Sequence, residues 1–287
     1  MFKKIMTDQT NYPKYYIITF ITILMLSVIV FVAYSKSKQV LPIEEEIVQF
    51  NFSIDGKQYI IPSAFHSFEF LNDMGFPWKK LTVSENNSDY PNESQLALNL
   101  GMRAADGIVS LYADEKEDAR FTRSTVLELT NKLGITPDIK NTVSALDQAV
   151  ILHAEQKALG DRLMDLEFQI EKNLHKQKKD NLAVLVELGG WLEGLYIVSK
   201  GISQNYNPAY AEILRQPHIA EIYIEVLTSL SKRTSDEKEK VLLESILKHI
   251  IEISKIANHT HKESFPLSKV KELYQISSNV KKLIESK

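Results

Sequence analysis

The sequence predicts a mainly all-α protein with one N-terminal transmembrane helix, a short β-hairpin and then an antiparallel bundle of several helices. Residues 15–34 form an uncharged apolar run, residues 48–61 alternate around a turn dipeptide, and apolar residues recur at helical spacing beyond residue 91. The predicted parts are a tail (1–14), the transmembrane helix (15–34), a linker (35–47), a β-hairpin and loop region (48–91) and a helical bundle domain (92–287).

Composition excludes several classes of function. The 287 residues carry a formal net charge of −3 and include no cysteine. Disulfides, thiolate metal sites, cysteine nucleophiles and a lipid-modified N-terminal cysteine are therefore excluded. Nucleic-acid binding is not expected either, because the chain lacks the basic surplus or stripe that neutralises phosphates.

The run from Tyr15 to Tyr34 has the length of a membrane span. A helix of twenty residues is about 30 Å long, which matches the hydrocarbon core of a bilayer. Its terminal tyrosines suit the two interfaces. The lipid bilayer is therefore the first expected partner. A cleaved signal peptide, with a site near Ala33-Tyr34-Ser35, and a buried core helix are the alternatives.

Lysines flanking this run give its expected orientation. Three precede it and two follow it closely, so the positive-inside rule places the N-terminus in the cytoplasm. The domain then lies on the periplasmic or extracytoplasmic side of a single-pass membrane protein. The lysines are Lys3, Lys4 and Lys14 before the run, and Lys36 and Lys38 after it.

The β-hairpin is predicted from alternation and from its turn. Apolar residues occupy every second position from Val48 to Ile54, and Asp55-Gly56 suits a type I′ turn. Strands are expected near 48–54 and 57–61. A loop is expected over 80–92. An isolated hairpin is marginal in water, so it should pack on the helices through nearby aromatic residues: Phe65, Phe68, Phe70, Phe76 and Trp78.

The helices of the bundle are predicted from apolar spacing and from their start and stop residues. Gly134 should follow one helix, Asp180 should cap an apolar helix at the centre of the domain, and Val241 should face the core. The short connections suit an antiparallel bundle, although a solenoid of helical hairpins stays open. The other expected starts are Asp114, Pro137, Asn207-Pro208, Pro217, Thr234 and the segment after Pro266.

Histidines and exposed-looking carboxylates give little sign of chemistry. His259 and His261 would share a face only on an extended segment, so a polar helix end is favoured over a metal site. His249 and Glu252 stand three residues apart without a supporting motif. A solvated helix face is the favoured interpretation of three further carboxylates: Asp161, Asp165 and Glu167.

Two carboxylates stand out because their helix is strongly apolar. Buried Glu187 and Glu193 would each need a partner. A structural salt bridge or hydrogen bond is favoured over a catalytic acid. The candidate partners are Arg103, Arg162 and Arg215.

The same helix contains the most unusual stretch, GGWLEGLY at 189–196. Glycine inside a helix costs about 1 kcal/mol relative to alanine, so the glycines predict a seam where a neighbouring helix approaches closely. The alternative is a ligand or partner groove. Its residues would be Trp191, Glu193, Tyr196, Glu187, Gly190 and Gly194.

Two stretches carry a resemblance to a family. GGWLEGLY with the preceding NLA, and LNLGMRAADGIVSLYADEKE at 98–117 followed by KLGI at 132–135, resemble uncharacterised bacterial envelope proteins, several of them lipoproteins. The resemblance covers about residues 95–260. It implies an envelope location and an α-helical fold, and it implies no activity. This chain departs from the family in having an apolar helix where the lipoproteins have a lipidated cysteine.

These observations predict a membrane-anchored, non-enzymatic helical domain of the cell envelope. Its expected partner is an envelope protein or a small ligand. No catalytic residue, metal or cofactor is expected. The alternatives are a structural subunit of a larger membrane complex, and an enzyme with a carboxylate-based site near Glu187 and Glu193.

Overall fold

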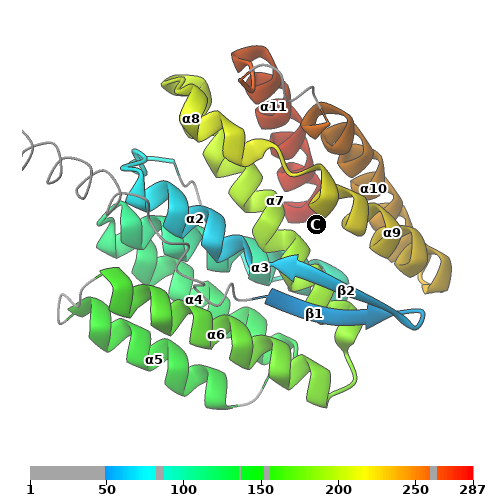
Figure 1. The fold of residues 1–287 in the computed structure, drawn as a ribbon. Helices are drawn as coiled ribbons and strands as arrows, with labels where there is room; N and C mark the ends of the chain where they lie inside the picture. Colours follow the sequence, from blue (N-terminus) through cyan, green and yellow to red (C-terminus); the bar gives the residue numbers. More distant parts are fainter. Residues whose placement is uncertain (1–48, 82–86, 136, 152–155, 259–263, 287) are drawn as a thin grey trace, which may run out of the picture. The chain divides into compact units, whose positions relative to one another are not determined.

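A computed structural model describes residues 49–81, 87–135, 137–151, 156–258 and 264–286. The predicted transmembrane helix at 15–34 and the histidines His259 and His261 lie outside the described residues. Figure 1 shows a mainly helical structure with a small antiparallel sheet, as predicted. The elements are β1 Gln49–Ile54, β2 Lys57–Pro62, α2 Ala64–Asp73, α3 Glu93–Tyr112, α4 Lys116–Lys132, α5 Pro137–Ile151, α6 Gln156–Lys176, α7 Asp180–Gln204, α8 Pro208–Ala211, η1 Glu212–Leu214, α9 Pro217–Arg233, α10 Glu237–Ala257 and α11 Leu267–Glu285.

The hairpin is confirmed together with its turn. Asp55 and Gly56 have φ values of 52° and 76°, as a type I′ turn requires. Ile54 pairs with Lys57, so the loop has two residues. Ile54 is buried, and β1 packs on α7. The apolar face of the hairpin therefore joins the core of the helical domain.

Helix α2 was not predicted, and it corrects one expectation about the aromatic residues. Phe68, Phe76 and Trp78 are buried. Trp78 meets Phe76 edge-on at 4.6 Å and Phe68 at 5.7 Å between ring centroids. Phe70, however, is 54% exposed, because the helical turn directs it away from the face that holds Phe68.

Most helix ends agree with their sequence signals. Asn207 caps α8 by accepting a hydrogen bond from the backbone N–H of Ala209. Gly134 follows α4 with a φ of 72°. Two details were wrong. Asp180 is the first residue of α7 rather than its cap, and Val241 on α10 is 60% exposed because the core-facing stripe of that helix does not include it.

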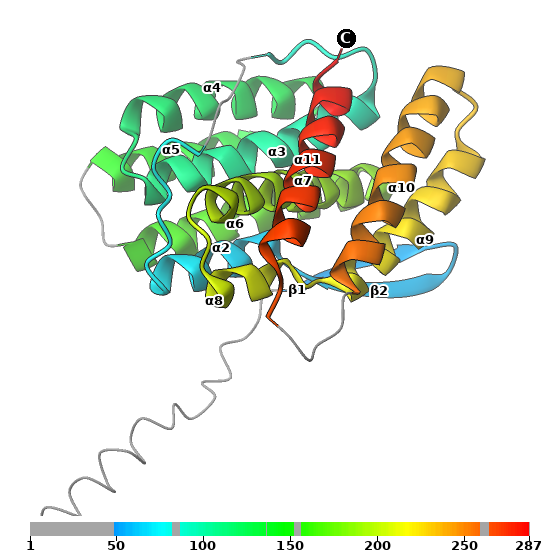
Figure 2. The same ribbon diagram turned by 90° about the horizontal axis from the view of Figure 1, so that it is seen from above.

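Helix α7 lies at the centre of the domain, as predicted. In Figure 1, α4, α5 and α6 lie on one side of α7, and α9, α10 and α11 lie on the other. Figure 2 shows α11 crossing α7, on which it packs. Within the described part, α7 is the one helix long and apolar enough to cross a bilayer. Since 94% of that apolar window is buried inside the structure, α7 is the core helix of the domain.

Glycines allow α3 and α7 to approach backbone to backbone. A Cβ atom on Gly101 would lie 1.8 Å from the carbonyl oxygen of Val186, and one on Gly189 would lie 2.0 Å from that of Leu98. The close packing predicted for the glycine-rich stretch is therefore confirmed at Gly189. Gly101 on α3 supplies the matching surface.

Candidate functional site

A cavity of about 110 Å³ lies among α3, α4, α5, α6 and α7. We call it the acid-pair cavity. By comparison with a cavity of roughly 150 Å³ that admits benzene, it has room for about four or five heavy atoms. It reaches the surface, because exposed side chains of α4 lie in its wall. Its apolar wall includes Phe68, Ile108, Leu111, Val126, Val143, Leu166, Ile170 and Val186.

Two carboxyl groups in that wall form the acid pair. Glu167 on α6 and Glu187 on α7 both line the cavity, and they lie close enough for each to affect the pKa of the other. Ser63 Oγ, at the end of β2, lies 2.7 Å from each carboxyl oxygen of Glu167 and donates to that group. Two neighbouring carboxyl groups are most stable when at least one carries a proton, because two like charges repel each other.

The surroundings keep protons on the pair. Burial raises the pKa of Glu167 to about 7, although hydrogen bonds from Ser63 and Glu187 act in the opposite direction. Burial, and then the neighbouring charge of Glu167, raises the pKa of Glu187 well above its usual value. Among the described residues, no lysine, arginine or histidine forms an ion pair with either group. The acid pair is therefore protonated, in whole or in part, near neutral pH.

The opposite side of the cavity is basic. Lys116, Arg120 and Arg123 of α4 lie in its wall. Lys116 and Arg120 are exposed, and each has an acidic neighbour: Asp114 at 3.9 Å and Glu117 at 3.5 Å, respectively. Arg123 is half-buried. The cavity thus has carboxyl groups at its inner end and two solvated cations where it reaches the surface.

The structure divides the six residues of the predicted groove among three environments. Glu187 and Gly190 line the acid-pair cavity. Trp191 and Gly194 line a separate cavity of about 30 Å³, where Trp191 Nε1 donates to Gln216 Oε1 at 2.8 Å.

Glu193 and Tyr196 lie in the third environment, facing α11. Tyr196 stacks on Tyr274 with 5.6 Å between ring centroids. Glu193 is fully buried, and its two carboxyl oxygens accept hydrogen bonds from Lys281 Nζ at 3.0 and 2.9 Å. The six residues therefore do not form one groove, because neighbouring positions on α7 face different helices.

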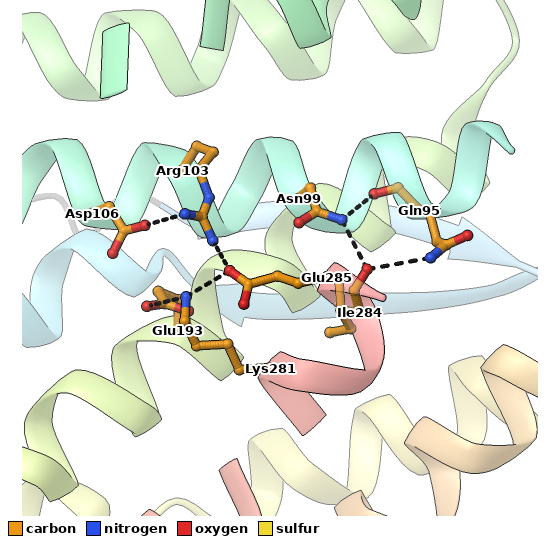
Figure 3. Close-up of polar contacts among 8 residues, drawn as sticks. All are labelled: Gln95, Asn99, Arg103, Asp106, Glu193, Lys281, Ile284 and Glu285. Carbon is orange, nitrogen blue, oxygen red and sulfur yellow. Dashed lines mark hydrogen bonds and ion pairs between the residues drawn. The ribbon is translucent and has the colours of Figure 1, made fainter. Parts of the chain in front are cut away.

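Glu193 belongs to a buried charged cluster, which Figure 3 shows between α3, α7 and α11. Arg103 pairs with Asp106 at 3.1 Å and with Glu285. Lys281 bridges Glu193 and Glu285, the latter at 2.9 Å. The cluster thus links α11 to the two central helices.

Amide side chains extend this attachment to the end of α11. Asn99 and Gln95 donate to the carbonyl oxygen of Ile284, and Gln95 also donates to that of Ser286. These bonds satisfy carbonyl groups that a helix C-terminus leaves unpaired.

The partner of Glu193 differs from the three arginines that were expected. Arg103 lies in the same cluster but binds other carboxylates. Arg215 pairs with Glu212 at 2.9 Å, and Arg162 is exposed. Burial raises the pKa of Glu193 to about 8, against the lowering effect of Lys281. With two cations and three carboxyl groups, the cluster is neutral when it holds one proton.

Glu167 corrects the expectation of a solvated carboxylate. It lies four residues after Leu163 and three before Ile170, so it shares their helix face. That spacing could have identified it. Ser63 gave no such signal, because β2 brings it to α6 from far away in the sequence.

Metal binding finds no support in the part of the chain that is described, where no three His, Asp or Glu side chains gather. His249 and Glu252 come within 3.4 Å as a pair. Comparison of the chain with protein-family models, curated proteins and solved structures gives no match. The resemblance to envelope proteins therefore stays a prediction.

Proposed function

We propose that this chain is a membrane-tethered, non-enzymatic binding protein whose helical domain holds a small amphipathic ligand in the acid-pair cavity. The cavity is the observation that carries the proposal. It combines an apolar wall with a few convergent polar groups, as small-molecule sites do. Residues 15–34 would supply the tether, and an envelope location on the extracytoplasmic side follows from the flanking lysines.

Binding is favoured over catalysis by the size and lining of the cavity. A carboxyl pair that shares a proton also serves aspartic proteases, so chemistry alone does not separate the two classes. A cavity of about 110 Å³, however, leaves no room for a peptide or oligosaccharide beside the carboxyl groups. Glu193, the other carboxylate considered for catalysis, is buried in an ion pair.

Ligand retention tests the binding function. The full chain is purified from its own membranes without denaturation, and small molecules released on unfolding are identified by mass spectrometry. We expect a compound that is retained by the wild type and lost from Ala104→Phe, because Ala104 lines the cavity and a phenyl ring would fill it. Ala209→Phe, at an exposed site on α8, is the control. Equal contents in all three proteins, or no compound at all, would contradict the proposal.

Membrane fractionation tests the tether. We expect the wild type to resist extraction by alkaline carbonate. Leu24→Arg with Leu26→Arg should make the chain extractable, since each arginine near the centre of a span costs about 3 kcal/mol. Replacing the same two residues by alanine is the control and should preserve resistance. Extraction of the wild type by carbonate would rule the tether out.

A further inference from the structure

The acid-pair cavity also indicates what kind of ligand it would hold. Glu167 and Glu187 line its inner end, and Ser63 Oγ donates to Glu167 at 2.7 Å. Among the described residues, no lysine, arginine or histidine forms an ion pair with Glu167 or Glu187. Charged or polar side chains from several elements nevertheless lie near the two carboxyl groups or line the cavity. These are Ser63 after β2, Glu171 on α6, Tyr223 on α9, Arg103 on α3, and Lys116, Arg120 and Arg123 on α4.

Arg103 is the one cavity-lining cation that lies deep in the structure, and it is already engaged. Its side chain is 1% exposed, and it pairs with Asp106 and Glu285 on the side facing α11. Lys116 and Arg120 are 46% and 69% exposed, so solvent screens their charges. Arg123 is half-buried, and it lies on α4 with these two cations. Glu187, which is buried, and the half-buried Glu167 are thus the acidic groups that a ligand inside the cavity can reach.

Resting on the proposed binding function, we propose that the ligand is a small organic cation: a primary ammonium group on a short apolar body, with about four or five heavy atoms in all. The ammonium group would donate to Glu167 and Glu187, and the apolar body would lie against α3, α4 and α6. An ammonium group offers three donors to two acceptor groups. It also supplies a positive charge that no ion pair of the described residues brings to these two groups.

Binding of this cation has a defined proton balance. In the free protein the pair holds protons, because burial raises the pKa of both carboxyl groups. An ammonium ion that binds a carboxylate of the pair must displace one proton, which goes to solvent. Affinity should therefore rise about tenfold per pH unit below pH 7 and level off above it. A neutral ligand of the same shape should show no such slope.

The test compares three probes of similar size on the full chain in lipid nanodiscs by saturation-transfer NMR. They are n-butylammonium, n-butanol and butyrate. We expect butylammonium to bind at least about tenfold more tightly than butanol at neutral pH, which corresponds to about 1.4 kcal/mol, and butyrate to bind weakest. Raising the pH from about 5 to about 7 should strengthen only the binding of butylammonium.

Variants locate the probe, and nanodiscs without the protein measure the contribution of lipid. Glu167→Gln and Glu187→Gln should each weaken butylammonium binding at least about tenfold and leave butanol binding unchanged. The matched control is Glu171→Gln, one turn further along α6 and outside the cavity wall, and it should change binding less than about twofold. Signal from nanodiscs without the protein measures partitioning into lipid and is subtracted. If a variant does not fold, the comparison of the three probes on the wild type still tests the proposed ligand class.

The outcomes distinguish an error in the ligand class from an error in the proposed binding function. Equal binding of butanol and butylammonium, or tighter binding of butyrate through the α4 cations, would overturn the ligand class while the cavity remains a binding site. Failure of all three probes would overturn the inference, and failure of the ligand-retention experiment as well would remove the proposed function.

Discussion

Gly101→Ala should destabilise the domain by about 4 kcal/mol or more, the range that marks a severe packing defect. In an isolated helix the change would be favourable by about 1 kcal/mol. Here the added methyl group would lie 1.8 Å from the carbonyl oxygen of Val186 and 2.7 Å from the backbone nitrogen of Gly190. Backbone atoms cannot move aside as a flexible side chain does, so α3 and α7 would have to separate and lose buried contacts along their length.

Urea unfolding of the full chain in mild detergent, followed by the fluorescence of Trp78 and Trp191, measures this loss. Gly107→Ala is the matched control because it lies on the same helix. Its added methyl group would meet a side-chain methyl of Thr122 at 3.3 Å, so we expect a change below about 1 kcal/mol. A Gly101→Ala protein as stable as this control would show that the helices do not meet at Gly101.

The sequence predicted those parts of the fold that local chemistry decides. A type I′ turn needs positive φ at two adjacent residues, and Asp55-Gly56 meets that need without help from the rest of the chain. Helix ends at Asn207 and Gly134 follow from backbone groups within a few residues. The central place of α7 follows from composition, since a helix apolar on all sides must be enclosed.

What the sequence did not reveal depends on contacts between distant elements. The glycines of α7 predicted a close neighbour but could not identify Gly101 as its contact point. Val241 continues the apolar spacing of α10, yet it is exposed, because the width of a buried stripe depends on which helices pack against it.

The candidate site shows the same limit. Glu187 was singled out because its helix is apolar, whereas Glu167 was taken for a surface residue because its helix is charged. Only the packing of α6 on α7 brings the two carboxyl groups together. A polar residue on an otherwise apolar helix face, such as Glu167 between Leu163 and Ile170, is therefore a reason to look for a polar partner on another element.

The buried charged cluster gives the second large expected effect. Burying an ion pair gains little over apolar packing, but removing one member leaves an uncompensated charge that costs about 3–5 kcal/mol. Lys281 is the member whose loss matters most, because it contacts both Glu193 and Glu285. Its neighbours raise the pKa of its ammonium group despite burial, so it stays charged in the folded protein.

Lys281→Met should therefore destabilise the domain by about 3–5 kcal/mol at pH 10 and by clearly less at pH 6. The difference arises at Glu193, whose pKa of about 8 in the folded wild type lies above the ordinary 4.5 and rises further without the lysine. At pH 6 this carboxyl group is protonated in both folded proteins, so its burial costs the same in each. Above about pH 8 the folded wild type can ionise Glu193 beside Lys281, whereas the folded variant cannot, so only the variant continues to lose stability. Lys282→Met, at the exposed neighbouring position, should change unfolding free energy by less than about 0.5 kcal/mol at either pH. Urea unfolding at the two pH values measures both variants, and a loss that is equal at pH 6 and pH 10 would contradict the role assigned to Glu193.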